Sequence, residues 1–92
     1  MEYINNVELL GFAGKSRRSG DRTVLQVATE YVYRSEDGCP TIETTWHTVV
    51  VDCETQFRWG DMVHVKGRLV NHTLENGVIT EVIADELIVA AR

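Results

Sequence analysis

The sequence predicts an all-β fold, a single small five-stranded barrel, on three observations. Most of the 92 residues fall into runs in which apolar or β-branched residues alternate with polar ones, which is the period of a strand with one buried face. Turn sequences separate these runs, most clearly Asp37-Gly38 and Asn76-Gly77, and such pairs favour hairpins. No apolar pattern with helical spacing extends over a sufficient length.

The strands follow from local composition. The first run alternates around Val7 and Leu9. Residues 81–87 have some helical propensity, but the β-branched residues there, such as Val82, favour a strand with a kink near residues 84–85. The expected strands span residues 6–14, 23–34, 41–52, 62–74 and 78–90.

Two connections are longer than a hairpin turn. Residues 15–22 are polar, basic and glycine-bearing, so we expect a long flexible loop between the first two strands. Residues 53–59 leave room for a helical turn or two at most. Phe57 and Trp59 in this second connection are expected to cap the open end of the barrel.

These elements define one fold. Gly11 and Gly67 lie inside strands, where a missing side chain permits the sharp coiling of a small barrel. Five strands with a longer connection after the third match the oligonucleotide/oligosaccharide-binding (OB) fold, a partly open Greek-key barrel. Since the chain is long enough for one modest core, residues 1–92 are expected to form a single domain.

The composition excludes several classes of protein. With 43% hydrophobic residues, 25% charged residues and one proline, the chain is expected to fold. No apolar run approaches the roughly 20 residues of a membrane span, and the N-terminus lacks the basic and apolar regions of a signal peptide. We therefore expect a cytoplasmic protein with no membrane partner.

Neither a metal site nor a catalytic site is expected. Cys39 and Cys53 are predicted to be free thiols. Together with the three histidines they lack the CxxC or HxxxH spacing of a zinc site. The serines have no evident histidine partner, and no phosphate-binding or dinucleotide motif occurs. The sequence thus predicts a protein that is not an enzyme and needs no cofactor or small-molecule substrate.

Single-stranded nucleic acid is the leading predicted ligand. Period two places Trp46 and Thr48 on one face of their strand and His47 and Val49 on the other. Because the valine face suits the core, Trp46 is expected outside, where bases can stack on it. The net charge of −5 argues against a dedicated duplex-binding protein. The basic residues gathered in segment 15–22 can still guide a polyanion.

The predicted site residues form two sets. In the first, aromatic and polar side chains contact bases and cations hold phosphates. In the second, exposed apolar residues, more than a small barrel can bury, and a histidine whose face suits the core or an interface predict a homodimer or homotetramer. Contacts with single-stranded DNA are predicted for Trp46, Tyr33, Tyr31, Thr48, Lys15, Arg17, Arg18, Arg22, Arg34, Lys66 and Arg68, and oligomer contacts for His47, Leu10 and Phe12.

Four motifs in a fixed order carry a resemblance. They are Asn6-Val7-x-Leu9-x-Gly11, Val27-Ala28-Thr29, Thr45-Trp46-His47-Thr48-Val49-Val50, and Gly60-Asp61-x-Val63-x-Val65-x-Gly67-Arg68-Leu69. Over almost its whole length the chain resembles the bacterial single-stranded DNA-binding protein (SSB) family. The resemblance implies an OB barrel, DNA binding without strong sequence preference, and dimers or tetramers. It matches Trp46 and Tyr33 to stacking aromatics and His47 to a histidine near the subunit interface.

The chain also departs from the family pattern. The family's stacking phenylalanine six residues beyond Trp46 is Asp52 here, and its tryptophan after the Gly-x-Leu segment of the fourth strand falls near Leu74. We expect the family's helix between the third and fourth strands to be reduced to a few residues here, and its acidic tail to be absent. The resemblance therefore implies a weaker binder without the family's usual means of recruiting other proteins.

Other functions stay open. The barrel could be a protein-interaction or assembly subunit of a replication or mobile-element complex with little affinity for DNA. The net charge of −5 and the two missing aromatic platforms favour that alternative. The same sheet could also take RNA or an oligosaccharide, because a fold alone does not determine the ligand.

Overall fold

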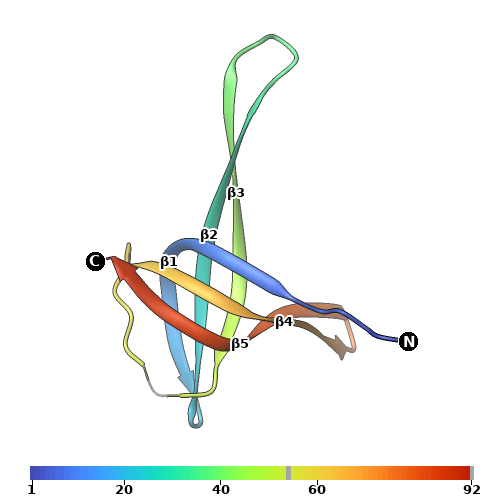
Figure 1. Ribbon diagram of the computed structural model, residues 1–92, viewed down its shortest axis with the longest axis vertical. Helices are drawn as coiled ribbons and strands as arrows, with labels where there is room; N and C mark the ends of the chain where they lie inside the picture. Colours follow the sequence, from blue (N-terminus) through green and yellow to red (C-terminus); the bar gives the residue numbers. More distant parts are fainter. Residues whose placement is uncertain (54, 92) are drawn as a thin grey trace.

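The computed structural model describes residues 1–53 and 55–91, which contain five strands and no helix (Figure 1). Glu54 of the predicted 53–59 connection and Arg92 of the predicted 1–92 domain lie outside the described residues. No helix in the described part has the length and apolar character needed to cross a bilayer. The strands are β1 (Val7–Ser19), β2 (Arg22–Arg34), β3 (Pro40–Val51), β4 (Met62–Leu74) and β5 (Gly77–Ala91).

The strands close into one barrel in the order β1-β2-β3-β5-β4. Neighbouring strands are antiparallel except β3 and β5, which pair in parallel where Val49 lies opposite Val82. β1 serves two partners, because it pairs with β4 from Val7 to Phe12 and with β2 from Phe12 to Ser19. The predicted all-β, five-stranded barrel is confirmed.

The core follows the period-two alternation of the strands. Inward-facing side chains from all five strands meet inside the barrel, and Val49, Val63 and Val65 have no exposed surface. Burial of such apolar area is the main stabilising term for a domain of this size. The buried cluster consists of Ala13, Leu25, Val27, Val49, Val51, Val63, Val65 and Val82.

Two glycines allow strands to cross closely. A Cβ on Gly11 would lie well inside van der Waals contact with the carbonyl group of Ala28, and a Cβ on Gly67 would meet that of Ile83 in the same way. Both glycines therefore lie where the backbones of two strands approach closely and leave no room for a side chain.

The predicted kink in the last strand is a β-bulge. Lys66 lies opposite Glu86, whereas the next residue, Gly67, lies opposite Ala84. Asp85 is thus the extra residue of β5, and such an insertion bends a strand. The kink falls where the sequence predicted it.

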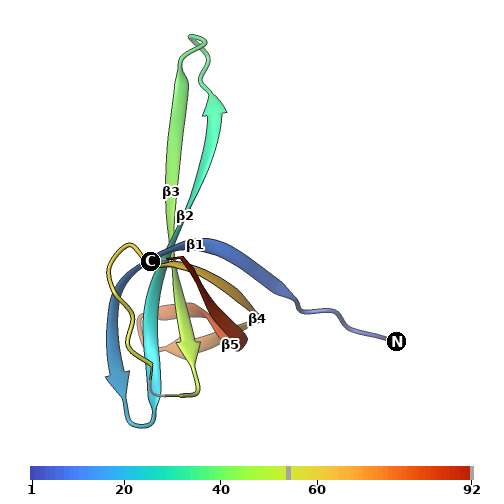
Figure 2. The ribbon, with the colours of Figure 1, turned by 60° about the vertical axis from the view of Figure 1, so that its left-hand side comes forward.

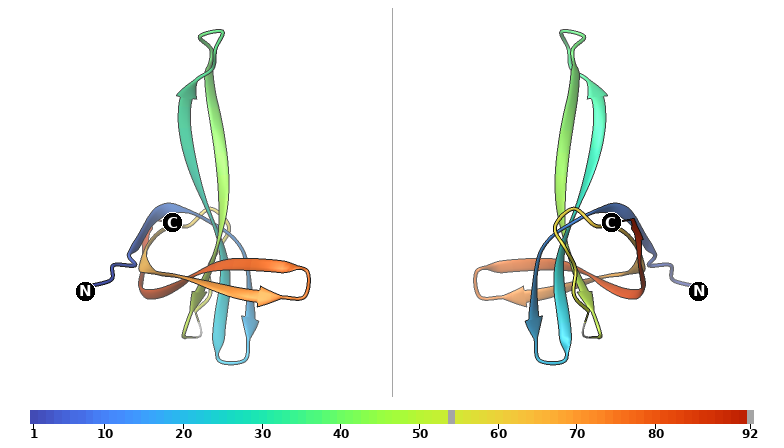
Figure 3. Two further views of the ribbon diagram at one scale, coloured as in Figure 1. Left: turned by 90° about the vertical axis from the view of Figure 1, so that its right-hand side faces the viewer. Right: turned by 90° about the vertical axis from the view of Figure 1, so that its left-hand side faces the viewer.

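Two hairpins project beyond the barrel (Figures 1 and 3). The first, the β2–β3 arm (residues 30–44), continues the β2–β3 ladder to Arg34 opposite Pro40. Its turn is closed by the Ser35 N–H, which donates to the Cys39 carbonyl (3.0 Å). The second, the β4–β5 arm (residues 68–83), ends where Leu74 lies opposite Gly77. Both turns were expected from their sequences.

The prediction of a long loop at residues 15–22 is wrong. β1 continues to Ser19 and pairs there with Arg22, the first residue of β2. Only Gly20 and Asp21 form the turn, and Gly20 has a φ of 67°, as a glycine does in the first position of a two-residue hairpin loop. The strand lacked a sequence signal because both of its faces are solvated at this end and carry polar residues.

The close strand crossing makes a prediction about stability. Gly67→Ala should lower the free energy of unfolding by at least about 2 kcal/mol, because the backbone of β5 blocks a Cβ and cannot move cheaply. Gly38→Ala is the matched control: its φ of 85° is strained for alanine, but a Cβ there meets nothing within 4 Å, so about 1 kcal/mol is expected. Urea unfolding measures both, and equal losses would contradict the crossing.

Candidate nucleic-acid interface

Trp46 lies on the outer surface of the barrel, as predicted. It pairs with Ala28 of β2, which pairs in turn with Phe12 of β1, so the three side chains form one row across the outer face. The alternate residue Val49 belongs to the core. With 51% of its surface exposed, the Trp46 ring is accessible to a flat ligand.

A second tryptophan lies against the first. The ring centroids of Trp46 and Trp59 are 6.2 Å apart and the ring planes meet at 66°, an edge-to-face arrangement favoured by aromatic quadrupoles. Gly14 of β1 makes room for both, because a Cβ there would lie 2.5 Å from the Trp46 ring and 3.5 Å from the Trp59 ring. Trp59 is 72% exposed. We call Trp46 and Trp59 the tryptophan pair.

Backbone hydrogen bonds hold Trp59 in this position. The Gly60 N–H donates to the Ala13 carbonyl (2.9 Å), and the Ala13 N–H donates to the Asp61 carbonyl (2.8 Å). The Asp61 side chain is buried and accepts a hydrogen bond from the Arg58 N–H (3.0 Å). These bonds close the turn at residues 58–61 and fasten the β3–β4 connection to β1.

The prediction that Phe57 and Trp59 both cap the barrel is wrong for Trp59. Phe57 does pack against the core, whereas Trp59 lies outside beside Trp46. The available signal was Gly60-Asp61 directly after Trp59, residues that favour a turn at this point.

Polar and basic groups border the tryptophan pair on the same face. The Gln26 side-chain amide donates to the Thr48 hydroxyl (3.1 Å). Gln26 and Thr48 form the next pair on the same face of the β2–β3 ladder after Ala28 and Trp46. A shallow cavity of about 160 Å³ lies next to Gln26 and is also bordered by Lys15 and Arg17. We call the whole surface the outer site: Trp46, Trp59, Gln26, Thr48, Lys15 and Arg17.

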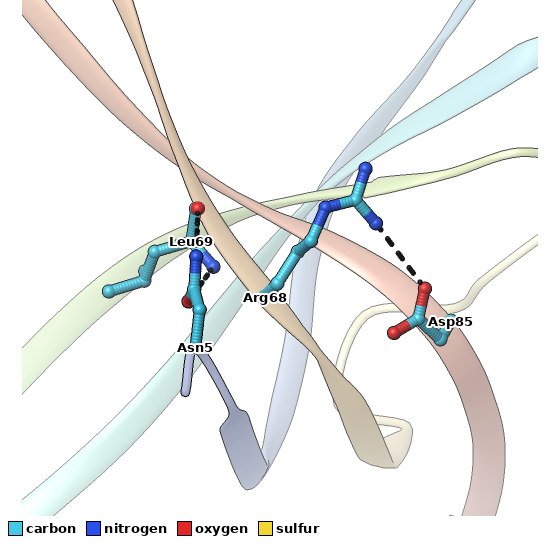
Figure 4. Close-up of polar contacts among 4 residues, drawn as sticks. All are labelled: Asn5, Arg68, Leu69 and Asp85. Carbon is cyan, nitrogen blue, oxygen red and sulfur yellow. Dashed lines mark hydrogen bonds and ion pairs between the residues drawn. The ribbon is translucent and has the colours of Figure 1, made fainter. Parts of the chain in front are cut away.

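Two other predicted cations lie beside carboxylates. The Arg22 Nε atom is 3.6 Å from an oxygen of Asp52, and the Arg68 guanidinium is 3.5 Å from an oxygen of Asp85 (Figure 4). Arg22 and Asp52 lie directly beyond the last pair of the β2–β3 ladder, Thr23 opposite Val51, and their even-numbered positions correspond to the face that carries Trp46. Asp52 therefore neutralises a cation at the very surface on which a polyanion would lie.

The remaining cations do not join the outer site. Lys66 of β4 lies between Glu8 of β1 and Glu86 of β5 in the sheet register. Arg34 is at the far end of the β2–β3 arm, where it donates to the turn carbonyl of Gly38 (3.3 Å). Arg18 borders a second cavity of about 370 Å³, which Arg17 also lines, and its partner Thr23 lies on the other face of the β1–β2 hairpin.

The two tyrosines lie on the opposite face from Trp46. Tyr31 pairs with Glu43 and Tyr33 with Thr41, at odd positions of β3, whereas Trp46 holds an even one, and successive residues of a strand alternate faces. The two tyrosine rings stack on each other with centroids 6.3 Å apart and planes at 22°. They form a separate aromatic pair on the β2–β3 arm, so the predicted aromatic residues do not make one platform.

The residues predicted for an oligomer contact are also divided. Leu10 and Phe12 are exposed on the outer face of β1. His47 is half-buried on the opposite face of β3, where its Nε2 atom is 2.7 Å from the Thr29 hydroxyl. Phe12 shares the row of Trp46, so this part of β1 borders the outer site.

The cysteine thiols and the histidines do not form a cluster. Cys39 and Cys53 are exposed and free. His64 lies against Glu8 (2.6 Å) and His72 against Glu81 (2.7 Å), each in its own pair. In residues 1–53 and 55–91 no group of three potential metal ligands occurs.

Comparison with solved structures identifies the fold. The SSB of Plasmodium falciparum, solved in complex with single-stranded DNA, is 26% identical and matches 96% of either chain with a TM-score of 0.76. A single-stranded DNA-binding protein of Thermus aquaticus matches 92% of this chain and 49% of its own, at 19% identity and a TM-score of 0.74. The mitochondrial single-stranded DNA-binding protein of S. cerevisiae matches 100% of this chain and 99% of its own, at 14% identity and a TM-score of 0.69.

Comparisons of the sequence alone find no match. No protein-family model and no curated protein matches the chain, as expected when so few positions are shared. The resemblance inferred from four short motifs is nevertheless confirmed by the fold over nearly all residues. The chain is thus similar to the single-stranded DNA-binding proteins of the OB fold, and it fits a divergent relative of that group.

Proposed function

We propose that the protein binds single-stranded DNA, largely without regard to sequence, in replication, recombination or repair. The observation that carries the proposal is the outer site, where two exposed tryptophans adjoin a hydrogen-bonded amide–hydroxyl pair and two cations. The similarity to an SSB solved with single-stranded DNA supports it. In this proposal the protein is a binding protein and not an enzyme, and its compartment stays the cytoplasm that the sequence predicts.

Base stacking supplies the main contact. A base can lie on the exposed Trp46 ring, and Trp59 holds that ring from the side while it offers a second apolar surface. Stacking on an aromatic side chain contributes about 1–3 kcal/mol per base and tolerates any base. The Gln26 amide and the Thr48 hydroxyl can then bond base edges or sugar oxygens.

Phosphate contacts are few. Lys15 and Arg17 lie on the outer site, whereas Arg22 is paired with Asp52 and Lys66 lies between carboxylates. Each phosphate contact on a single strand contributes about −0.7 to the slope of log K against log salt. We therefore expect a slope of roughly −1 to −2 and a correspondingly modest affinity.

The tyrosine pair acts as a second, separate contact in this proposal. Tyr31 and Tyr33 face away from Trp46, so a strand has to pass around the edge of the β2–β3 arm to touch both sites. A short oligonucleotide should therefore use the outer site alone. Arg18, Arg34 and Arg68, which were also predicted to contact DNA, likewise lie outside the outer site.

Self-assembly is the second part of the proposal. Leu10 and Phe12 expose apolar surface on β1, and His47 is half-buried already in the single chain. We propose a homodimer or homotetramer that covers these residues, which light scattering on the purified protein can measure. If no oligonucleotide binds, the result would favour a role in protein assembly without DNA binding.

The tryptophan pair makes the first prediction. Trp46→Ala should weaken binding to an oligo-dT of about 15 nucleotides at least fivefold, from the loss of about 1 kcal/mol or more of stacking. Trp59→Ala should also weaken binding, because it loosens the Trp46 ring. The factor should be smaller, since the main stacking surface stays in place. Fluorescence anisotropy of a dye-labelled oligonucleotide measures both.

The matched control is Tyr31→Ala, which removes an exposed ring from the opposite face. Its affinity for the short oligonucleotide should stay unchanged. Equal losses at Tyr31 and Trp46, or no loss at Trp46, would contradict the outer site. An RNA oligonucleotide of the same length tests the choice between DNA and RNA.

Asp52 makes the second prediction. Asp52→Asn should strengthen binding about threefold or more at low salt, because it frees Arg22 and removes a negative charge from the DNA-facing surface. The salt slope should become steeper by about 0.7. Asp85→Asn frees Arg68 away from the outer site and serves as the control. If both variants behave alike, only the net charge matters.

His47 makes the third prediction. Burial lowers the pKa of the His47 imidazole below its ordinary value of 6.5, so the folded chain favours the neutral ring. Unfolded chains protonate this ring first as the pH falls below 6.5, and the stability that it contributes is lost as the pH passes down through the lowered pKa. The free energy of unfolding should fall more between pH 7 and 5 in the original protein than in His47→Gln. Identical pH profiles would contradict this.

A further inference from the structure

β4 keeps an open edge beyond the barrel. β1 pairs with β4 only as far as Val7 opposite Gly67. β4 runs on to Leu74, and within the described residues its strand partner there is β5 on the other side. The backbone groups on the free side of such a strand can pair with any extended segment that reaches them.

Asn5 already occupies the first position on this edge. Counting back two residues from Val7 puts Asn5 opposite Leu69 in the β1–β4 register. There the Asn5 Nδ2 atom donates to the Leu69 carbonyl and its Oδ1 atom accepts from the Leu69 N–H, both at 2.9 Å (Figure 4). The side-chain amide thus makes the two bonds that a backbone makes in a hydrogen-bonded antiparallel pair.

The residues before Asn5 suit the rest of the edge. In the same register Ile4 falls opposite Val70, Tyr3 opposite Asn71 and Glu2 opposite His72. The first of these pairs puts an aliphatic residue beside a β-branched one, a combination that stabilises antiparallel sheets. The last puts Glu2 beside the His72 imidazole, which Glu81 already contacts at 2.7 Å.

The same residues have no other place to pack in this structure. Tyr3 is 88% exposed and Ile4 is 83% exposed, although both have high strand propensity. Figure 2 shows the segment before β1 leading away from the barrel. Docking on β4 would remove apolar surface from water and satisfy backbone groups at the same time.

We propose that residues 1–4 dock on the open edge of β4 as an antiparallel continuation of β1, with Asn5 as the hinge. The docked segment covers the edge from Leu69 to His72 and protects the β4–β5 arm from pairing with another chain. This inference does not depend on the proposed DNA binding.

Amide hydrogen exchange tests the docking on the intact chain. Because both backbone groups of Leu69 face Asn5, those of Asn71 face the same way. In the docked state the Asn71 N–H donates to the Tyr3 carbonyl, and the Tyr3 N–H donates to the Asn71 carbonyl. Tyr3→Pro removes that donor, whereas Ile4→Pro removes an N–H that points away from β4 and serves as the matched control.

The expected result is about tenfold slower exchange of the Asn71 amide in the original protein and in Ile4→Pro than in Tyr3→Pro. Equal exchange in all three proteins would overturn the proposal. Both substitutions lie outside the barrel, so the fold is expected to persist, and the unchanged exchange of core amides such as that of Val65 verifies this.

A disulfide test separates docking within one chain from exchange between two chains. In a Cys39→Ser, Cys53→Ser background, Glu2→Cys with His72→Cys places two thiols at a non-hydrogen-bonded pair, with Cα atoms about 4.5 Å apart in the docked state, which suits a disulfide. Mild oxidation should link them within one chain, at least about tenfold faster than Glu2→Cys with Asn71→Cys, whose side chains point to opposite faces. Linked dimers, or no difference between the two pairs, would overturn the proposal.

Discussion

The candidate interface depends on one contact between distant parts of the chain: the backbone of Ala13 bonded to that of Gly60 and Asp61. This pair of hydrogen bonds brings the β3–β4 connection against β1 at the point where β1 passes from its β4 partner to its β2 partner. Trp59 is thereby placed over Gly14 and beside Trp46. Barrel closure, the packing of Phe57 against the core and the exposed tryptophan pair are therefore parts of one arrangement.

Much of the fold could be predicted because the alternation of apolar residues reports directly on burial. The inward valines of β3 and β4, the kink at Asp85 and the two glycine crossings all followed from local sequence. The end of β1 could not, since a solvated hairpin carries no apolar pattern and Ser16 to Ser19 look like a loop.

The candidate site was less predictable, for reasons of geometry. The contact of Trp46 with Trp59 arises from the path of the β3–β4 connection, which no local pattern encodes. The face of the tyrosines was accessible in principle: once the turn at residues 35–39 sets Arg34 opposite Pro40, parity puts Tyr31 and Tyr33 opposite Trp46's face. Ion pairs such as Arg22–Asp52 connect residues that the sequence separates, so cations counted from the sequence overstate the charge that a polyanion meets.

The position of the tryptophan pair also has a spectroscopic consequence. The chain contains two tryptophans, and both lie on the same small surface with their rings in contact range. Indole emission from this protein therefore comes from one location, and excitation can pass between the two rings. When only the indoles are excited, the intrinsic emission is a local probe of that patch and needs no added label.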